Sequence, residues 1–209
     1  MRLNLLRPQR PPPPPKVHAF LAVHYDEEFL NEVAALAERL RGDARLSAAT
    51  WVPAHAVDTT IHFFLDTREA QRARLTAFVD ELAALASELP APLHVRASRL
   101  HGLPTADSAH FLVVDVEDDG PARTLTTLQA RVEAEAVALG YKAHERPFAT
   151  FLKLARVTPA VDVSGLADAA SSLPAARITA ISLYASSPVQ IGDVHNRYDC
   201  LATAELEAT

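Results

Sequence analysis

Two short segments of the chain carry residues that could do chemistry, placed at alternate positions. They are Asp58, Thr60 and His62 in the first segment, and Phe151, Lys153 and Ala155 in the second. Residues two apart in a β-strand lie on the same face of a sheet, so each set is expected to point in one direction. Together the two segments offer a carboxylate, a hydroxyl, an imidazole and an ammonium group.

Lys153 and Asp58 carry opposite charges, which allows two interpretations. The ammonium group of Lys153 could bind a phosphate or a nucleotide as a point charge. It could equally form an ion pair with Asp58 and partly close the space between the segments. Asp58 could act as a base in principle, but an unperturbed carboxylate is about two pKa units too acidic and would repel a phosphodiester.

Histidine is the side chain best suited to proton transfer near neutral pH. His62 lies two residues after Thr60, so it is expected on the same face as Asp58 and Thr60. It could be a relocated acid or base, although a single strand histidine is more often packed in a core or at a rim. His144 is expected in a loop from which its ring could reach the site, and His55 and His101 are also expected in loops. No two histidines stand at metal-ligand spacing beside a carboxylate, so neither a metal nor a cofactor is expected.

The elements around these segments indicate the α+β class. Short apolar, β-branched and aromatic runs predict strands over residues 17–23, 48–52, 59–65, 93–100, 110–116, 148–157, 178–185 and 198–206. Apolar residues at helical spacing predict helices from Asp26 to Gly42, over 68–89, from Gly120 to Leu139, and over 163–173. Consecutive strand pairs favour antiparallel sheets, and the recurring order of elements predicts two pseudo-symmetric lobes with helices outside and a central groove.

The first residues differ in composition from the rest. Residues 11–15 are an unbroken run of proline flanked by basic side chains, which favours polyproline II and excludes a helix or a central strand. We expect residues 1–15 to be a flexible basic tail and residues 16–209 to be a single bilobal domain. The tail is either a spacer or a docking peptide for a protein partner that recognises proline.

Bulk composition excludes several classes of protein. The chain is 49% hydrophobic and 22% charged, and its six glycines form neither a P-loop nor a dinucleotide fingerprint. The net charge of −6 means that any contact with nucleic acid must come from a local basic site. No run approaches the ~20 apolar residues that span a bilayer, and the first residues do not resemble a secretory signal, so the cytoplasm is the expected compartment. We also expect a monomer. The single cysteine, Cys200, excludes an intrachain disulfide and is expected to be buried.

The surroundings of the first segment resemble a known motif. Trp51-Val52-Pro53 precedes an apolar stretch and then Asp58-Thr59-Thr60. This order resembles the first motif of the RNA 2′,3′-cyclic phosphodiesterases, or 2′-5′ RNA ligase-like proteins, of the two-histidine phosphoesterase superfamily. In that family Trp-Val-Pro leads to His-x-Thr on a strand. Here Asp58 stands in the place of the histidine, and Thr60 keeps the place of the threonine.

The second segment is similar to the second motif of that family. Arg146-Pro147-Phe148 matches its Arg-Pro-Phe lead, and Phe151-Leu152-Lys153-Leu154-Ala155-Arg156 matches His-x-Thr-Leu-Ala-Arg. Phe151 therefore stands in the place of the histidine and Lys153 in that of the threonine. The resemblance covers about residues 17–206 and implies that the two flanking arginines help to bind RNA or phosphate, although solvated arginines at strand ends are equally consistent.

The replacements imply that the family's chemistry is lost. Its mechanism needs two imidazoles, one to take a proton from the attacking water and one to protonate the leaving oxygen, while threonine hydroxyls hold phosphate oxygens. Phe151 cannot transfer a proton, so we expect a catalytically degenerate hydrolase-like protein, a pseudoenzyme. Binding of a phosphate-bearing nucleotide or RNA end is then expected from Thr60, Lys153, Arg146 and Arg156.

Two alternatives remain open. The chain could be an active cyclic phosphodiesterase that uses the displaced histidines His62 or His144, each within about 3 Å or one water of the phosphate. It could instead be a protein-interaction module that uses the proline-rich tail and a closed groove.

Overall fold

The computed structural model describes residues 17–88, 93–119, 123–143, 148–186 and 198–206. Its strands are β1 (Val17–Tyr25), β2 (Ala49–Trp51), β3 (Thr59–Thr67), β4 (His94–Thr105), β5 (Ser108–Asp118), β6 (Phe151–Val161), β7 (Ala175–Ser186) and β8 (Tyr198–Glu205). The helices are α1 (Glu27–Arg41), α2 (Glu69–Glu88) and α3 (Thr124–Ala138), with the 3₁₀ turns η1 (Ala44–Leu46), η2 (Ala54–Ala56) and η3 (Ser164–Ala170). None of these helices is long and apolar enough to cross a membrane.

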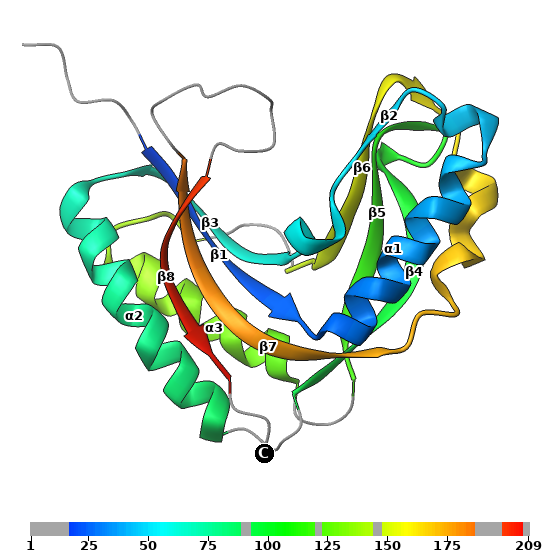
Figure 1. The fold of residues 1–209 in the computed structure, drawn as a ribbon. Helices are drawn as coiled ribbons and strands as arrows, with labels where there is room; N and C mark the ends of the chain where they lie inside the picture. Colours follow the sequence, from blue (N-terminus) through cyan, green and yellow to red (C-terminus); the bar gives the residue numbers. More distant parts are fainter. Residues whose placement is uncertain (1–16, 89–92, 120–122, 144–147, 187–197, 207–209) are drawn as a thin grey trace, which may run out of the picture.

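The strands form one antiparallel sheet in the order β2-β6-β5-β4-β7-β1-β3, with β8 paired to β7. The sheet is strongly curved, and α2 and α3 lie outside one end of it while α1 lies outside the other (Figure 1). The α+β class and the bilobal arrangement are therefore confirmed. The two lobes are not separate sheets, because β7 pairs with β4 at Ala175 to Arg177 and with β1 from Ile178 onward.

Helix α1 begins and ends where the sequence predicted. The side chain of Asp26 caps it by accepting a hydrogen bond from the amide of Phe29 at 2.9 Å, and Gly42 ends it. The second carboxylate oxygen of Asp26 accepts a hydrogen bond from the amide of Arg177, which ties the helix to β7. The cap thus fixes α1 against the strand that joins the lobes.

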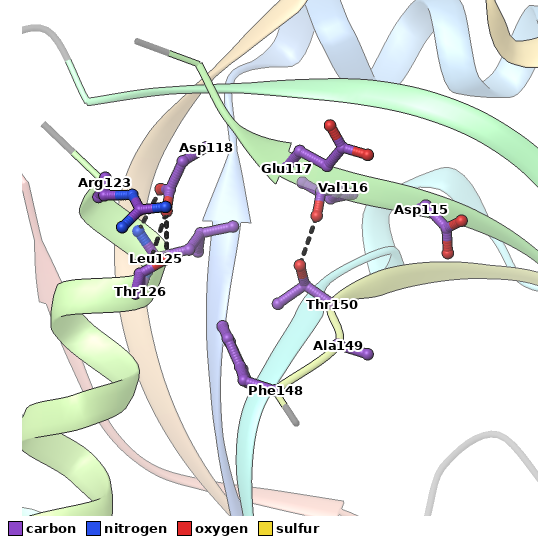
Figure 2. A pocket seen from close by; sticks show the side chains of 10 residues that line it. All are labelled: Asp115, Val116, Glu117, Asp118, Arg123, Leu125, Thr126, Phe148, Ala149 and Thr150. Carbon is purple, nitrogen blue, oxygen red and sulfur yellow. Dashed lines mark hydrogen bonds between the residues drawn. The ribbon is translucent and has the colours of Figure 1, made fainter. Parts of the chain in front are cut away.

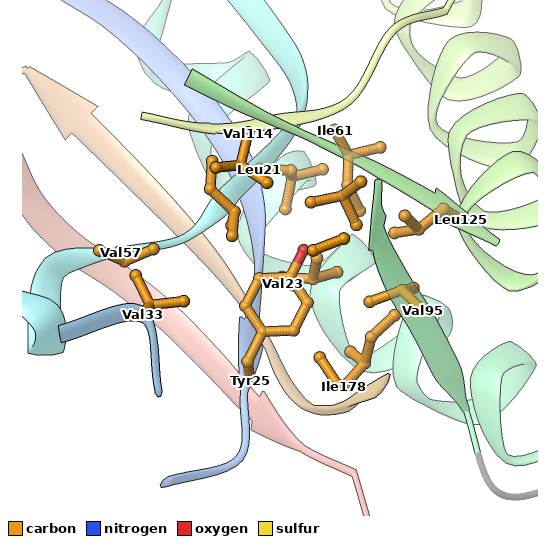
Figure 3. Close-up of a cluster of buried hydrophobic side chains, with 14 of the residues drawn as sticks. Leu21, Val23, Tyr25, Val33, Val57, Ile61, Val95, Val114, Leu125 and Ile178 are labelled. Atoms are coloured by element: carbon orange, nitrogen blue, oxygen red, sulfur yellow. The ribbon is translucent and has the colours of Figure 1, made fainter. Parts of the chain in front are cut away.

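A single hydrophobic core runs through both lobes (Figure 3). Val33 of α1 and Val57, just before β3, pack in the same cluster as Leu21 and Tyr25 of β1. The Tyr25 hydroxyl donates a hydrogen bond to Oγ1 of Thr59 at 2.5 Å. Residues on both sides of position 58 are therefore held rigidly by the core.

The hairpin of β4 and β5 is longer than predicted. Residues 102–108 were expected to be a loop, but most of them continue the two strands, and His101 lies in β4. Gly102 is required there by close packing, because a Cβ atom at this position would lie 2.3 Å from Cβ of Ala109 and 2.9 Å from Cγ2 of Val163. Gly102 therefore marks a close approach of β4 and β5.

Some predictions fall outside the described residues or are wrong. The proline-rich tail, residues 1–15, and the predicted start of the third helix at Gly120 lie outside the described ranges. Cys200 is exposed rather than buried. It lies on β8, which pairs only with β7 among the described strands, so this edge strand packs against fewer neighbours than a central one.

Candidate functional site

Both motif segments place side chains on the inner side of the curved sheet. We call this side, turned away from α1, α2 and α3, the concave face, and its principal residues are Phe20, Thr60, Phe63, Tyr184, Phe111, Phe151, Lys153 and Arg156. In the β3 lobe the register pairs Phe20 with both Phe63 and Tyr184. Intervening residues such as Leu21 are fully buried on the helix side. Successive side chains of these strands thus point alternately into the core and toward the candidate site.

Asp58, in the place of the first motif histidine, lies between η2 and β3 and is partly buried. Its neighbours Val57 and Thr59 are 4% and 0% exposed, so the chain on both sides of Asp58 is packed in the core. Burial raises the pKa of Asp58 to about 6, and the Lys153 ammonium acts in the opposite direction. The carboxyl group can therefore exchange a proton near neutral pH, unlike the unperturbed carboxylate assumed from sequence.

Lys153 extends from β6, on the other lobe, toward the same region. Strands β3 and β6 contact each other, and their first residues lie side by side (Figure 1). The charges of Asp58 and Lys153 interact, but none of the ion pairs formed among the described residues joins them. The sequence prediction that this pair could close the groove is not supported by a direct contact.

A β-bulge changes which residues of β6 share the concave face. Val113 of β5 pairs with Lys153, whereas Leu112 pairs with Ala155, so one residue, Leu154, is extra on β6. Ala155 was expected on the concave face and is instead fully buried. Arg156 takes its place and is exposed beside Lys153.

The equivalent bulge on β3 removes His62 from the site. Ala22 of β1 pairs with Thr60 and Leu21 with His62, so Ile61 is extra and His62 turns to the helix side. The imidazole is 4% exposed, and its Nδ1 lies 3.3 Å from Oε2 of Glu133 on α3. The expectation that His62 shares the face of Thr60 is wrong, and with it the geometric basis for His62 as a displaced acid or base.

The two bulges occupy equivalent places. Each follows the threonine place of its motif by one residue, at Ile61 and at Leu154. After each bulge the next residue on the concave face is Phe63 in one lobe and Arg156 in the other. The pseudo-symmetry of the two lobes therefore includes the position of this β-bulge.

Sequence reasoning missed a histidine on β1 that faces the site. Nε2 of His24 lies 3.2 Å from the hydroxyl of Tyr184, and the Asp58 carboxylate helps burial to raise the pKa of that hydroxyl. Burial lowers the pKa of His24, and Glu205 partly opposes this shift. The alternation of Phe20, Ala22 and His24 along β1 was the signal that could have revealed it.

A second missed group is a histidine and carboxylate pair on the other lobe. His101 of β4 pairs with Val113 in the register, and Val113 pairs with Lys153, so the three share the concave face. Nε2 of His101 lies 2.8 Å from Oδ1 of Asp115. Its predicted position in a loop concealed this arrangement.

Exposed aromatic rings border the site in the β3 lobe. Phe63 is 39% exposed and Tyr198 is 50% exposed, although both contact the ring of Phe20, at 6.0 and 4.9 Å between centroids. Such rings offer flat apolar surfaces on which a base could stack. His144 and Arg146 lie outside the described residues, so their roles stay predictions.

A cavity of about 590 Å³ lies where β5, the start of α3 and residues 148–150 meet (Figure 2). Its lining includes the carboxylates of Asp115, Glu117 and Asp118. Asp118 accepts hydrogen bonds from the amides of Leu125 and Thr126, at 2.6 and 3.1 Å, and so caps α3. Three carboxylates against one cation, Arg123, make this cavity a poor site for a phosphate, and Asp118 serves to anchor the helix.

Comparison with known proteins identifies the fold. Neither a protein-family model nor a curated protein matches the sequence. Among solved structures, TT0787 of Thermus thermophilus is 21% identical, with 90% of this chain and 97% of that chain covered and a TM-score of 0.64. E. coli LigT complexed with 3′-AMP is 18% identical, with 92% and 99% covered and a TM-score of 0.58. A structure described as a phosphoesterase is 18% identical, with 92% and 99% covered and a TM-score of 0.56.

LigT from E. coli has also been solved with NADP+, with phosphate and with ATP. At these identities the likeness establishes architecture, and the covered shares show that it extends over nearly the whole of each chain. The motif resemblance and the three-dimensional match point to the same group of proteins. The chain has the LigT-like fold, as the resemblance to the two-histidine phosphoesterases predicted.

Proposed function

We propose that the chain is an RNA 2′,3′-cyclic phosphodiesterase-like protein that binds a phosphate-bearing nucleotide or RNA end on its concave face and has lost two-imidazole hydrolysis. The observation that carries this proposal is the composition of the site. Thr60 from one lobe and Lys153 and Arg156 from the other are exposed on one face. The motif resemblance assigns Asp58 and Phe151 to the histidine places.

The charges of the site support binding of an anion. Neither Lys153 nor Arg156 forms an ion pair with another described residue, so both cations are available to a ligand. A hydroxyl and two cations suit phosphate oxygens, because hydrogen bonds from charged donors are the stronger ones. Nearby Phe63 and Tyr198 favour a nucleotide over a bare phosphate, and the ligands solved with LigT, which include 3′-AMP and ATP, agree with that class.

The loss of hydrolysis follows from the groups in the histidine places. A positioned acid or base contributes typically 10²–10⁴-fold to a rate, and Phe151 contributes nothing of this kind. Asp58 retains one proton-exchanging group, but the reaction needs a second that acts in the opposite direction. The site is therefore suited to bind a phosphate ester without cleaving it.

Binding and turnover of adenosine 2′,3′-cyclic phosphate test the proposal. We expect micromolar to millimolar binding without turnover by calorimetry and chromatography, and a loss of roughly tenfold or more in affinity for Lys153→Ala, since one charge-assisted hydrogen bond disappears. Arg39→Ala, an exposed arginine on the outer helix α1, is the matched control and should bind as the wild type does. Robust turnover abolished by Asp58→Ala, or equal binding by Lys153→Ala, contradicts the proposal.

A second candidate function is supported by the His101 and Asp115 pair. The His101 imidazole lies 2.8 Å from the Asp115 carboxylate and is in register with Val113 and Lys153. It could act as a general acid or base on a bound phosphodiester. The chain would then be an active cyclic phosphodiesterase that uses a displaced histidine. Turnover lost in His101→Ala and kept in His55→Ala, an exposed histidine of η2, would favour this candidate over the first.

A further inference from the structure

We infer that Asp58 binds the phosphate group of the ligand as a neutral carboxylic acid, so that the concave face takes up a proton together with its anion. This inference rests on the proposed function and concerns the same site. It addresses a contradiction in the sequence, which places an acidic residue where a phosphate must lie.

The position of Asp58 makes it a neighbour of any phosphate held by the motif residues. It stands two residues before Thr60 and shares its side of the chain. Lys153 approaches from the opposite lobe closely enough for the two charges to interact. A phosphate that contacts Thr60 and Lys153 would therefore lie beside Asp58, which is partly buried directly before β3 between the buried residues Val57 and Thr59.

The protonation state of Asp58 then decides whether the site attracts or repels its ligand. An ionised carboxylate repels the phosphate and also weakens the field of Lys153. A protonated carboxyl group donates its O–H to a phosphate oxygen and leaves the ammonium charge uncompensated. Burial raises the pKa of Asp58 to about 6, so roughly one tenth of the molecules are protonated near pH 7. The affinity there is then only about tenfold below that of the fully protonated site.

The other titratable groups around Asp58 do not produce the same effect. Tyr25 of β1 and Tyr184 of β7 both have a pKa raised by burial, so they remain neutral. Lys153 of β6 lowers the pKa of Asp58 and so opposes its protonation. His24, bonded to Tyr184, has a pKa lowered by burial and would gain charge only in more acidic solution, so it needs a control variant.

The sign of the pH dependence follows directly. Below about pH 6 Asp58 is already protonated and affinity should be flat, while above it affinity should fall by up to about tenfold per pH unit. A bound anion raises the pKa of Asp58, and the affinity stops falling with pH once the pH exceeds that higher pKa. Asp58→Asn, a permanently neutral side chain of the same shape, should bind about as the wild type does near pH 5 and up to about a hundredfold more tightly near pH 8.

Calorimetry with adenosine 2′,3′-cyclic phosphate between about pH 5 and pH 8 tests this inference, because the single charge of that diester is constant over the range. Repeating the titration near pH 7 in buffers of different ionisation enthalpy should show uptake of close to one proton by the wild type and none by Asp58→Asn. His24→Gln should keep the dependence. Asp80→Asn, an exposed carboxylate on the outer helix α2, is the matched control for the change of charge and should also keep it.

The failures of the two proposals are distinguishable. If the diester binds and Lys153→Ala weakens it, but Asp58→Asn changes neither the pH dependence nor the proton uptake, the inference is wrong and the proposed function stands. If neither the wild type nor Asp58→Asn binds the diester at any pH, while both unfold at the same temperature, the proposed function fails as well. A dependence that disappears in His24→Gln rather than in Asp58→Asn also overturns the inference.

Discussion

Single residues decide what the concave face can do. Asp58 and Phe151 stand where the two-histidine family has its imidazoles, and each changes the chemistry in a different way. Burial gives Asp58 a pKa near 6, which keeps a proton-exchanging group in the site. Phe151, 38% exposed on the opposite lobe, contributes only apolar surface. The site is therefore asymmetric, with one lobe polar and the other apolar at equivalent positions.

Restoring both imidazoles should restore hydrolysis. The double variant Asp58→His, Phe151→His places an acid and a base at equivalent positions of the two lobes, and we expect cleavage of adenosine 2′,3′-cyclic phosphate at least about 10²-fold faster than by the wild type. Product formation followed by chromatography measures this. Phe151→His alone is the control and should gain little, because one imidazole cannot serve both proton transfers. A double variant that folds and binds the diester but cleaves no faster than Phe151→His would refute this role of the two positions.

The burial of Asp58 could not be predicted from its own segment. An aspartate between Val57 and Thr59 is read as an ordinary carboxylate until the packing of β1 and α1 is known. The same holds for His24, whose partner Tyr184 is distant in sequence and meets it only through the pairing of β1 with β7. Pattern reasoning identified the position of Asp58 but not its environment, and it missed His24 altogether.

At the scale of elements, strand alternation predicts faces only where strands are regular. Alternation holds at the start of β6, since Phe151 and Lys153 share the concave face. One extra residue at Ile61 and one at Leu154 invert everything that follows, which is why His62 is buried. A bulge has no distinct side-chain signature in these strands, so alternation alone could not reveal it.

Close packing of β4 against its neighbours leaves no room for a side chain at Gly102. Gly102→Ala places a methyl group 2.3 Å from Cβ of Ala109, and we expect it to lower the free energy of unfolding by about 1–3 kcal/mol. Urea denaturation followed by circular dichroism measures this change.

Gly165→Ala provides the matched control for that substitution. A Cβ atom there meets its nearest neighbour, a guanidinium nitrogen of Arg45, only at 3.9 Å, so stability should change by less than about 0.5 kcal/mol. Equal destabilisation by the two variants would mean that close packing is not what requires glycine at position 102.

At the scale of the whole molecule, the curved sheet brings two distant motifs to one face. β7 pairs with both β4 and β1, and this continuity sets the relative position of the lobes. The similarity to TT0787 and to LigT covers at least 90% of this chain, so the architecture is shared over nearly its whole length. Fold and framework were predictable from motif order, whereas the loss or survival of activity depends on a few side chains.

A crystal structure with adenosine 2′,3′-cyclic phosphate tests the central claim most directly. We predict an uncleaved cyclic phosphate on the concave face, in contact with the Thr60 hydroxyl and the Lys153 ammonium, with a carboxyl oxygen of Asp58 within hydrogen-bond distance of a phosphate oxygen. A ring-opened phosphate in that position, or a ligand bound elsewhere with the concave face empty, would contradict the account.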